Sequence, residues 1–141
     1  MAIHPDDLVA LPPVLIVEDN HDLASFMDLL LRTAGYQTLI AHNGREALAR
    51  MHEQKPCVVL LDLAMPVMDG FEFRVRQLAE PALADVPVVC VTAHYRPSQV
   101  VATLGLRCLS KPVDVDEVER VVAEICGSGS VPPGEVSHPR G

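Results

Sequence analysis

Short aliphatic runs alternate with amphipathic segments along most of this chain, and this alternation restricts its fold more than any other feature. The clearest runs are residues 14–17, 58–61 and 88–91, and residues 36–41 and 106–109 are weaker runs of the same kind. Such runs are typical of strands that are buried on both faces. Because a helical pattern follows each run, the chain predicts five strand–helix units, and therefore a parallel sheet with helices on both faces.

The helix boundaries are indicated by the residues that flank the amphipathic segments. Apolar positions at helical spacing run from Leu23 to Ala34, and Gly35 suits the position just past a helix end. Asn43 and Glu46 have the spacing of a capping box, which predicts the start of a second helix. Further helices are expected at residues 70–78, at residues 97–104 and after a cap formed by Asp114 with Glu117.

Units of this kind assemble in few ways. Crossovers between parallel strands are almost always right-handed, and five strand–helix units favour the strand order 2-1-3-4-5. The predicted fold class is therefore α/β, a three-layer (βα)5 flavodoxin-like fold with a central five-stranded parallel sheet. We expect this domain at residues 13–126, an N-terminal extension at residues 1–12, and a flexible C-terminal tail at residues 127–141, where Gly, Ser and Pro are frequent.

The composition limits where the protein acts and what it binds. The chain has 141 residues, with no visible secretory signal and no apolar run near the roughly 18 residues of a membrane span. Its formal net charge of −8 would repel the phosphate backbone of a nucleic acid. We therefore expect a cytoplasmic protein that binds neither nucleic acid nor membrane.

The cysteines of the chain have no pattern of a metal site or a redox motif. They are widely spaced, and none belongs to a CxxC pair. In a cytoplasmic protein such cysteines are expected to be reduced and mostly buried. This expectation applies to all four, which are Cys57, Cys90, Cys108 and Cys126.

Polar residues gather where the predicted strands end. Five of them follow or end four different strands: Glu18 with Asp19, Asp62, Thr92 and Lys111. In a doubly wound sheet, ligands bind at the carboxyl ends of the strands, where the strand order reverses. That point lies between the first and third strands, so we expect these side chains to converge there.

The types of residue at this edge indicate phosphoryl chemistry. Clustered carboxylates repel one another, which raises their pKa values unless a cation is present, and Mg²⁺ prefers such oxygen ligands. A lysine and a threonine hydroxyl suit the oxygens of a phosphoryl group. A carboxylate in the middle of such a site can attack phosphorus and form an acyl phosphate. The sequence therefore predicts a magnesium site for phosphoryl chemistry at this edge of the sheet.

The same residues resemble a known family, the CheY-like receiver domain of two-component response regulators. The resemblance extends over about residues 13–126. It rests on four motifs in the family's order, which are Glu18-Asp19, the stretch DLAMPVMDG that begins at Asp62, Thr92-Ala93, and Lys111-Pro112.

Membership of this family would define the partners of the chain. Asp62 would accept a phosphoryl group from the phosphohistidine of a sensor histidine kinase or a histidine phosphotransfer protein. Phosphorylation would then change binding to a downstream protein that the sequence does not name. The chain would be a monomer or a weak homodimer. It would be a signalling phosphoacceptor that catalyses only its own phosphorylation and dephosphorylation, and not an enzyme with an outside substrate.

The resemblance also implies a role for each residue of the site. The ligands of Mg²⁺ would be Asp19, Glu18, Asp62 and the backbone carbonyl of Ala64. The phosphoryl oxygens would be contacted by Thr92 and Lys111. The bond between Lys111 and Pro112 is often a cis peptide in such domains, in line with the weak trans preference of bonds before proline.

Two features of the chain depart from the family pattern. Cys108 stands three residues before Lys111, where the family commonly has Tyr or Phe, whose rotation relays phosphorylation. The segment from Thr92 to Lys111 is also about one helical turn (~3–4 residues) shorter than is common. The relay of the signal and the helix at residues 97–104 are therefore expected to differ from the usual arrangement.

Two other functions fit part of the pattern. A Mg²⁺-dependent phosphatase with an aspartate nucleophile would need a second aspartate two residues after Asp62 as a general acid, and Ala64 stands there instead. A degenerate receiver, which signals without phosphate, is compatible with Cys108 and the short fourth helix. The missing second aspartate weighs against the phosphatase, and the complete set of acidic residues weighs against the degenerate receiver.

Overall fold

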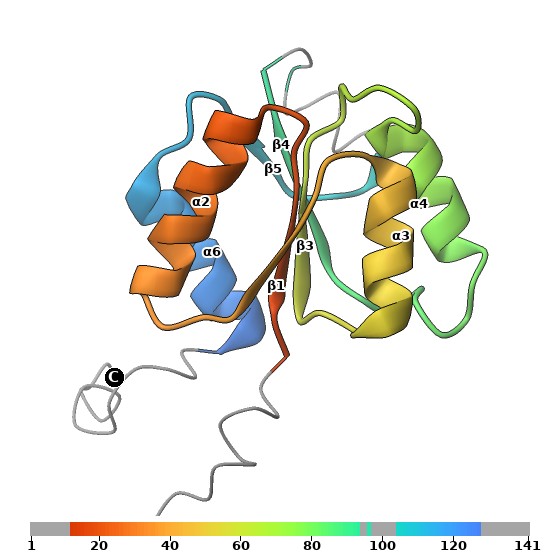
Figure 1. Ribbon diagram of the computed structural model, residues 1–141, viewed down its shortest axis with the longest axis horizontal. Coiled ribbons are helices and arrows are strands. Elements are labelled where there is room, and N and C mark those ends of the chain that lie inside the picture. Colours follow the sequence, from red (N-terminus) through yellow and green to blue (C-terminus); the bar gives the residue numbers. More distant parts are fainter. Residues whose placement is uncertain (1–11, 94–95, 97–103, 128–141) are drawn as a thin grey trace, which may run out of the picture.

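The computed structural model of the chain describes residues 12–93, 96 and 104–127. Their strands form one parallel sheet in the order β2-β1-β3-β4-β5 (Figure 1). This order confirms the predicted topology. The strands are β1 (Val14–Val17), β2 (Thr38–Ala41), β3 (Val58–Leu61), β4 (Val88–Thr92) and β5 (Cys108–Ser110).

Helices cover both faces of the sheet, as predicted. The helices of the described residues are α2 (His21–Thr33), α3 (Gly44–Glu53), α4 (Gly70–Leu78) and α6 (Val115–Cys126). Figure 1 shows α2 and α6 on one face, and α3 and α4 on the other. None of these helices is long and apolar enough to cross a membrane.

Some predicted segments fall outside the described residues. The helix expected at residues 97–104 does so except for Leu104. The N-terminal extension is described only at Pro12, and the C-terminal tail only at Gly127. The predicted domain boundaries therefore remain predictions.

The sheet separates two apolar layers, because successive strand residues point to opposite faces. In β1, Leu15 and Val17 pack with α3 and α4, whereas Val14 and Ile16 pack with α2 and α6. All four residues of β1 and of β3 are buried. These strands read as uninterrupted aliphatic runs because neither face of the sheet meets water.

Side-chain caps define where the helices begin at the carboxyl edge of the sheet. Asn43 caps α3 by accepting the N–H of Glu46 at 2.9 Å, and the Glu46 carboxylate accepts the N–H of His42 at 2.9 Å. The predicted cap at Asn43 is confirmed, but the Glu46 carboxylate accepts from His42, the residue before the cap, and not from Asn43 as a capping box requires. Asp114 caps α6, also as predicted, by accepting the N–H groups of Asp116 and Glu117.

Two strands begin two residues later than the apolar pattern predicts. At β2, the N–H of Tyr36 donates to the carbonyl of Leu31, because Gly35 in the left-handed region (φ 100°) closes the end of α2 there. At β5, pairing with β4 starts at Cys108, although the apolar run starts at Leu106. Tertiary pairing thus decides these strand limits rather than local hydrophobicity.

The prediction of four reduced cysteines is wrong for two of them. Cys57 and Cys126 form a disulfide with their Cα atoms 5.4 Å apart, whereas Cys90 and Cys108 are free. Cys57 directly precedes β3 and Cys126 ends α6. Because α6 runs back across the sheet, its last residue meets the amino end of β3, a proximity that the spacing of the cysteines in the sequence does not reveal.

Candidate functional site

The backbone ladder of the sheet holds the site residues in register. Asp62 donates its N–H to the carbonyl of Val17 at 3.0 Å, which extends the β1–β3 pairing by one residue. Lys111 donates its N–H to the carbonyl of Thr92 at 3.0 Å, which extends the β4–β5 pairing in the same way. The predicted residues therefore all lie at the carboxyl edge of the sheet.

Three carboxylates converge at this edge, as the strand ends predicted. One oxygen from each of Glu18, Asp19 and Asp62 lies within 4.8 Å of the other two. Glu18 is 2% exposed and Asp62 is 3% exposed, whereas Asp19 is more accessible. A set of hard oxygen donors at this separation fits a divalent cation such as Mg²⁺, which binds one or two carboxylates and retains several waters.

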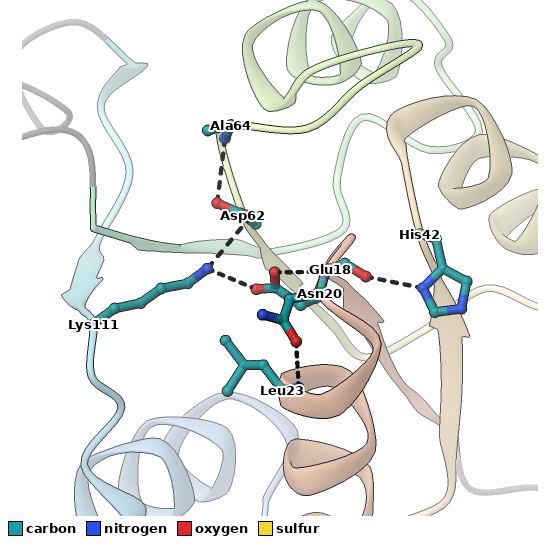
Figure 2. Close-up of polar contacts among 7 residues, drawn as sticks. All are labelled: Glu18, Asn20, Leu23, His42, Asp62, Ala64 and Lys111. Atoms are coloured by element: carbon teal, nitrogen blue, oxygen red, sulfur yellow. Dashed lines mark hydrogen bonds and ion pairs between the residues drawn. The ribbon is translucent and has the colours of Figure 1, made fainter.

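Lys111 supplies the positive charge of the cluster (Figure 2). Its Nζ lies 2.9 Å from Oε1 of Glu18 and 3.5 Å from Oδ2 of Asp62. Burial lowers the pKa of Lys111, but the hydrogen bond to Glu18 and the charge of Asp62 outweigh it, so the pKa is raised overall. The bond between Lys111 and Pro112 is cis, as the family resemblance implied.

The carboxyl group of Asp62 has a raised pKa. Burial and the nearby charge of Glu18 raise its pKa to about 6, against the opposing effects of Lys111 and the Ala64 N–H group. That N–H donates to Oδ1 of Asp62 at 3.2 Å and orients the carboxylate (Figure 2). Added positive charge would lower the pKa and keep Asp62 ionised as a nucleophile.

The loop after β3 folds back tightly onto Leu63. A Cβ atom on Gly70 would lie 2.8 Å from Cα of Leu63, so only glycine allows α4 to start there. Val67 adopts φ 68°, and the N–H of Met68 donates to the carbonyl of Pro66 at 2.7 Å. This is a three-residue γ-turn, which is a strained backbone conformation.

Thr92 also lies at this edge, as the last residue of β4, and it is buried. The predicted contacts of its hydroxyl with a phosphoryl group, and the predicted metal ligation by the Ala64 carbonyl, remain predictions.

Two neighbours of the acidic cluster were missed by the sequence analysis. Asn20 caps α2 and donates its backbone N–H to Oε2 of Glu18 at 3.1 Å. His42 follows β2, and its Nδ1 lies 3.0 Å from the carbonyl oxygen of Glu18. The rule that located the other residues, namely a polar residue just past a strand, would have found His42 if it had been applied to β2.

Comparison with known proteins identifies the family. The response regulator receiver domain matches residues 14–123. The chain belongs to the response regulator receiver family. This receiver is 34% identical to protein PilH of Pseudomonas aeruginosa over 113 residues, which are 77% of this chain and 93% of PilH. It is 32% identical to sporulation initiation phosphotransferase F of Bacillus subtilis over 114 residues, 77% of this chain and 89% of that protein.

A solved structure shows the same likeness at the level of the fold. The receiver domain of a sensor histidine kinase from Pseudomonas aeruginosa, which has a magnesium ion coordinated in its active site cleft, superposes with a TM-score of 0.75. The two are 26% identical over 84% of this chain and 99% of that domain. This receiver is thus a phosphoacceptor of two-component signalling, which confirms the family and the function that the resemblance implied.

The departure at Cys108 is visible in the fold. Cys108 is half-buried and packs on the apolar layer beside α3 and α4. In the parallel pairing of β4 with β5, it lies next to the free cysteine Cys90. Burial raises the pKa of the Cys108 thiol, so it behaves as a small apolar side chain. This receiver therefore lacks an aromatic ring at the position where the family commonly has one.

Proposed function

We propose that Asp62 is the phosphorylated residue of this receiver. The observation that carries the proposal is the convergence of three carboxylates within 4.8 Å, together with the ammonium of Lys111. Within the cluster, Asp62 directly follows the central strand β3 and is oriented by the Ala64 N–H. The fit of Mg²⁺ to these donors makes Asp19, Glu18, Asp62 and the Ala64 carbonyl the proposed ligands.

The transfer is a substitution at phosphorus. An oxygen of Asp62 forms a bond to phosphorus while the bond to the imidazole nitrogen of a phosphohistidine breaks, and the imidazole leaves with the bonding electron pair and takes up a proton. Mg²⁺, when bound, supplies positive charge to the phosphoryl oxygens. Lys111 adds a second positive charge from the β5 side. We expect Thr92, the last residue of β4, to donate its hydroxyl to the phosphoryl oxygens of the product.

The proposed donor is a sensor histidine kinase or a histidine phosphotransfer protein, and the output is altered binding to a downstream protein. The chain assists only its own phosphorylation and dephosphorylation. Ala64, which lies beside Asp62, offers no carboxylate as a general acid, and this weighs against a phosphatase that acts on outside substrates. The complete acidic cluster weighs against a receiver that signals without phosphate.

We also propose that the receiver acts in the cytoplasm, where such kinases would phosphorylate it. The Cys57–Cys126 disulfide weighs against this location, because disulfides persist mainly in oxidising compartments. Trapping thiols in intact cells with an alkylating reagent decides the point. In a reducing cytoplasm the disulfide of the structure would be open, so a cytoplasmic receiver should yield alkylated Cys57 and Cys126. Unmodified cysteines that become reactive only after reduction would contradict the location.

Intact mass spectrometry tests the phosphorylation site. The protein is incubated with Mg²⁺ and phosphoramidate, and the expected product is heavier by about 80 Da, the mass of one phosphoryl group. Asp62→Ala should abolish the gain, whereas the control Asp85→Ala should retain it, because Asp85 is exposed and pairs with Lys55 outside the site. A gain that persists in Asp62→Ala would refute the assignment. No gain in the wild type would favour a degenerate receiver, and turnover of phosphate esters would favour a phosphatase.

A further inference from the structure

His42 is attached to the acidic cluster through the backbone of Glu18. A carbonyl oxygen only accepts hydrogen bonds, so the 3.0 Å contact requires that Nδ1 of His42 carries a proton and donates it. The N–H of Glu18 donates in turn to the carbonyl of Ala41 at 2.9 Å. Glu18 is thus held on both sides of its backbone by consecutive residues at the end of β2.

The ring of His42 is itself held in place. Its backbone N–H donates to Oε1 of Glu46 in the first turn of α3. Its imidazole stacks on that of His21, the first residue of α2, with ring centroids 3.9 Å apart and planes within 3°. His42 therefore joins the start of α2 through its ring, and the start of α3 through its backbone N–H, to the peptide that connects Glu18 with Asp19.

That peptide connects two of the proposed metal ligands. Figure 2 shows Lys111 and His42 approaching Glu18 from opposite sides, Lys111 at the carboxylate and His42 at the carbonyl. If the peptide rotated, the side chains of Glu18 and Asp19 would turn relative to each other, and the oxygens that now lie within 4.8 Å would separate. Groups that orient metal ligands in this way commonly change metal affinity when they are removed.

We propose that His42 is a positioning residue for the metal site. By donating Nδ1–H to the Glu18 carbonyl, it fixes the peptide from which the Glu18 and Asp19 carboxylates converge. The inference rests on the proposed Mg²⁺ site and adds a residue from β2, a strand that contributes no ligand. His42 does not contact the metal or the phosphoryl group, so its removal acts on metal affinity and not on the chemistry at saturating metal.

Three variants test the proposal by calorimetric titration with Mg²⁺. His42→Ala removes the donor and should raise the Kd by about tenfold. His42→Asn should restore an affinity near that of the wild type, because its side-chain amide also donates one atom beyond Cγ. The control is His52→Ala. In the wild type the ring of His52 pairs with Glu80 on the exposed surface, so this substitution should leave the Kd unchanged.

The kinetics of phosphorylation give a second measurement. With phosphoramidate as donor, His42→Ala should need about tenfold more Mg²⁺ for half-maximal rate and should reach the wild-type rate at saturation. A Kd equal to that of the wild type, or a His42→Asn variant as weak as His42→Ala, would overturn the role of His42. If the wild type itself binds no Mg²⁺, the proposed metal site fails instead, so the two failures are distinguishable. The melting temperature without metal reports whether the variants are folded.

Discussion

The two ends of the sheet differ in the interactions that surround them. At the carboxyl end, two carboxylates are almost completely buried beside Lys111, and a γ-turn is held at Val67. At the amino end, the Cys57–Cys126 disulfide joins α6 to β3, and the hydroxyl of Tyr36 donates to the carbonyl of Gly127 at 3.1 Å. Buried charge and strain lie at the functional edge, and covalent and hydrogen-bonded connections lie at the opposite edge.

This contrast indicates how the receiver combines stability with a reactive site. Buried like charges and a strained turn destabilise the folded state, and such features persist only where the surrounding structure compensates. The aliphatic layers between the two ends are shared by both, so the difference arises from the residues that flank the strands. Changes at the amino end should therefore alter stability and leave metal binding unchanged. Changes among the acidic residues at the carboxyl end should alter both.

Loss of the disulfide should have the largest effect. The cysteines lie 69 positions apart in the sequence, and a cross-link that closes such a loop in the unfolded chain contributes on the order of 4 kcal/mol. Cys57→Ser combined with Cys126→Ser should lower the free energy of unfolding by about that amount in urea titrations. The Kd for Mg²⁺ should not change, because the disulfide is at the end of the sheet away from the acids.

A reducing agent supplies the matched control. Dithiothreitol should destabilise the wild type as much as the double substitution does, and it should leave the double variant unchanged. If the reducing agent leaves the urea midpoint of the wild type where it was, the amino end is not stabilised in this way and the contrast between the ends fails.

Removing the charge of Asp62 should have the opposite sign and a smaller size. The pKa of Asp62 is raised to about 6 in the folded, metal-free protein by burial and by Glu18, and it is about 4 in the unfolded chain. Between these values the unfolded state loses its proton first, so folding stability falls as pH rises from about 4 to 6 and remains low above. Asp62→Asn lacks this loss and should be more stable than the wild type by on the order of 1–3 kcal/mol at pH 8 without metal.

Urea unfolding across pH in EDTA measures this difference. The difference in free energy of unfolding between the two proteins should be smallest near pH 4. It should grow as the pH rises to about 6 and should stay constant above that pH. Added Mg²⁺ should reduce the gap at pH 8 by stabilising only the wild type. A difference that does not depend on pH would contradict the assignment of electrostatic strain to the carboxyl end.

The sequence was sufficient for the sheet order and for most of the carboxyl edge. Asp62 and Thr92 could be found because each interrupts or follows an apolar strand, and the parallel topology then requires their convergence. A pattern that is local in sequence was enough, since the sheet converts strand ends into neighbours. The same rule extends to His42 after β2, whose ring orientation nevertheless depends on stacking with His21.

The amino end was not predictable in this way. The pairing of Cys57 with Cys126 depends on where α6 ends relative to β3, and neither spacing nor composition encodes that distance. The hydrogen bond from Tyr36 to Gly127 has the same origin, since it joins residues 91 positions apart. The left-handed backbone of Val67 was also unpredictable, because β-branched residues disfavour it and only the surrounding loop imposes it.

Val67→Gly should have the smallest effect and should sharpen the contrast between the ends. The Val67 side chain is 70% exposed, so its removal loses little packing, while glycine adopts φ 68° without strain. Relief of the strain should exceed the greater entropy of glycine in the unfolded chain, which leaves a net stabilisation of about 1 kcal/mol. Val67→Ala is the matched control, because it removes the β-branch but keeps a Cβ atom, and it should stabilise the fold less than glycine does. If glycine instead destabilises the protein, the turn at Val67 stores no strain, and the carboxyl end owes its lower stability to buried charge alone.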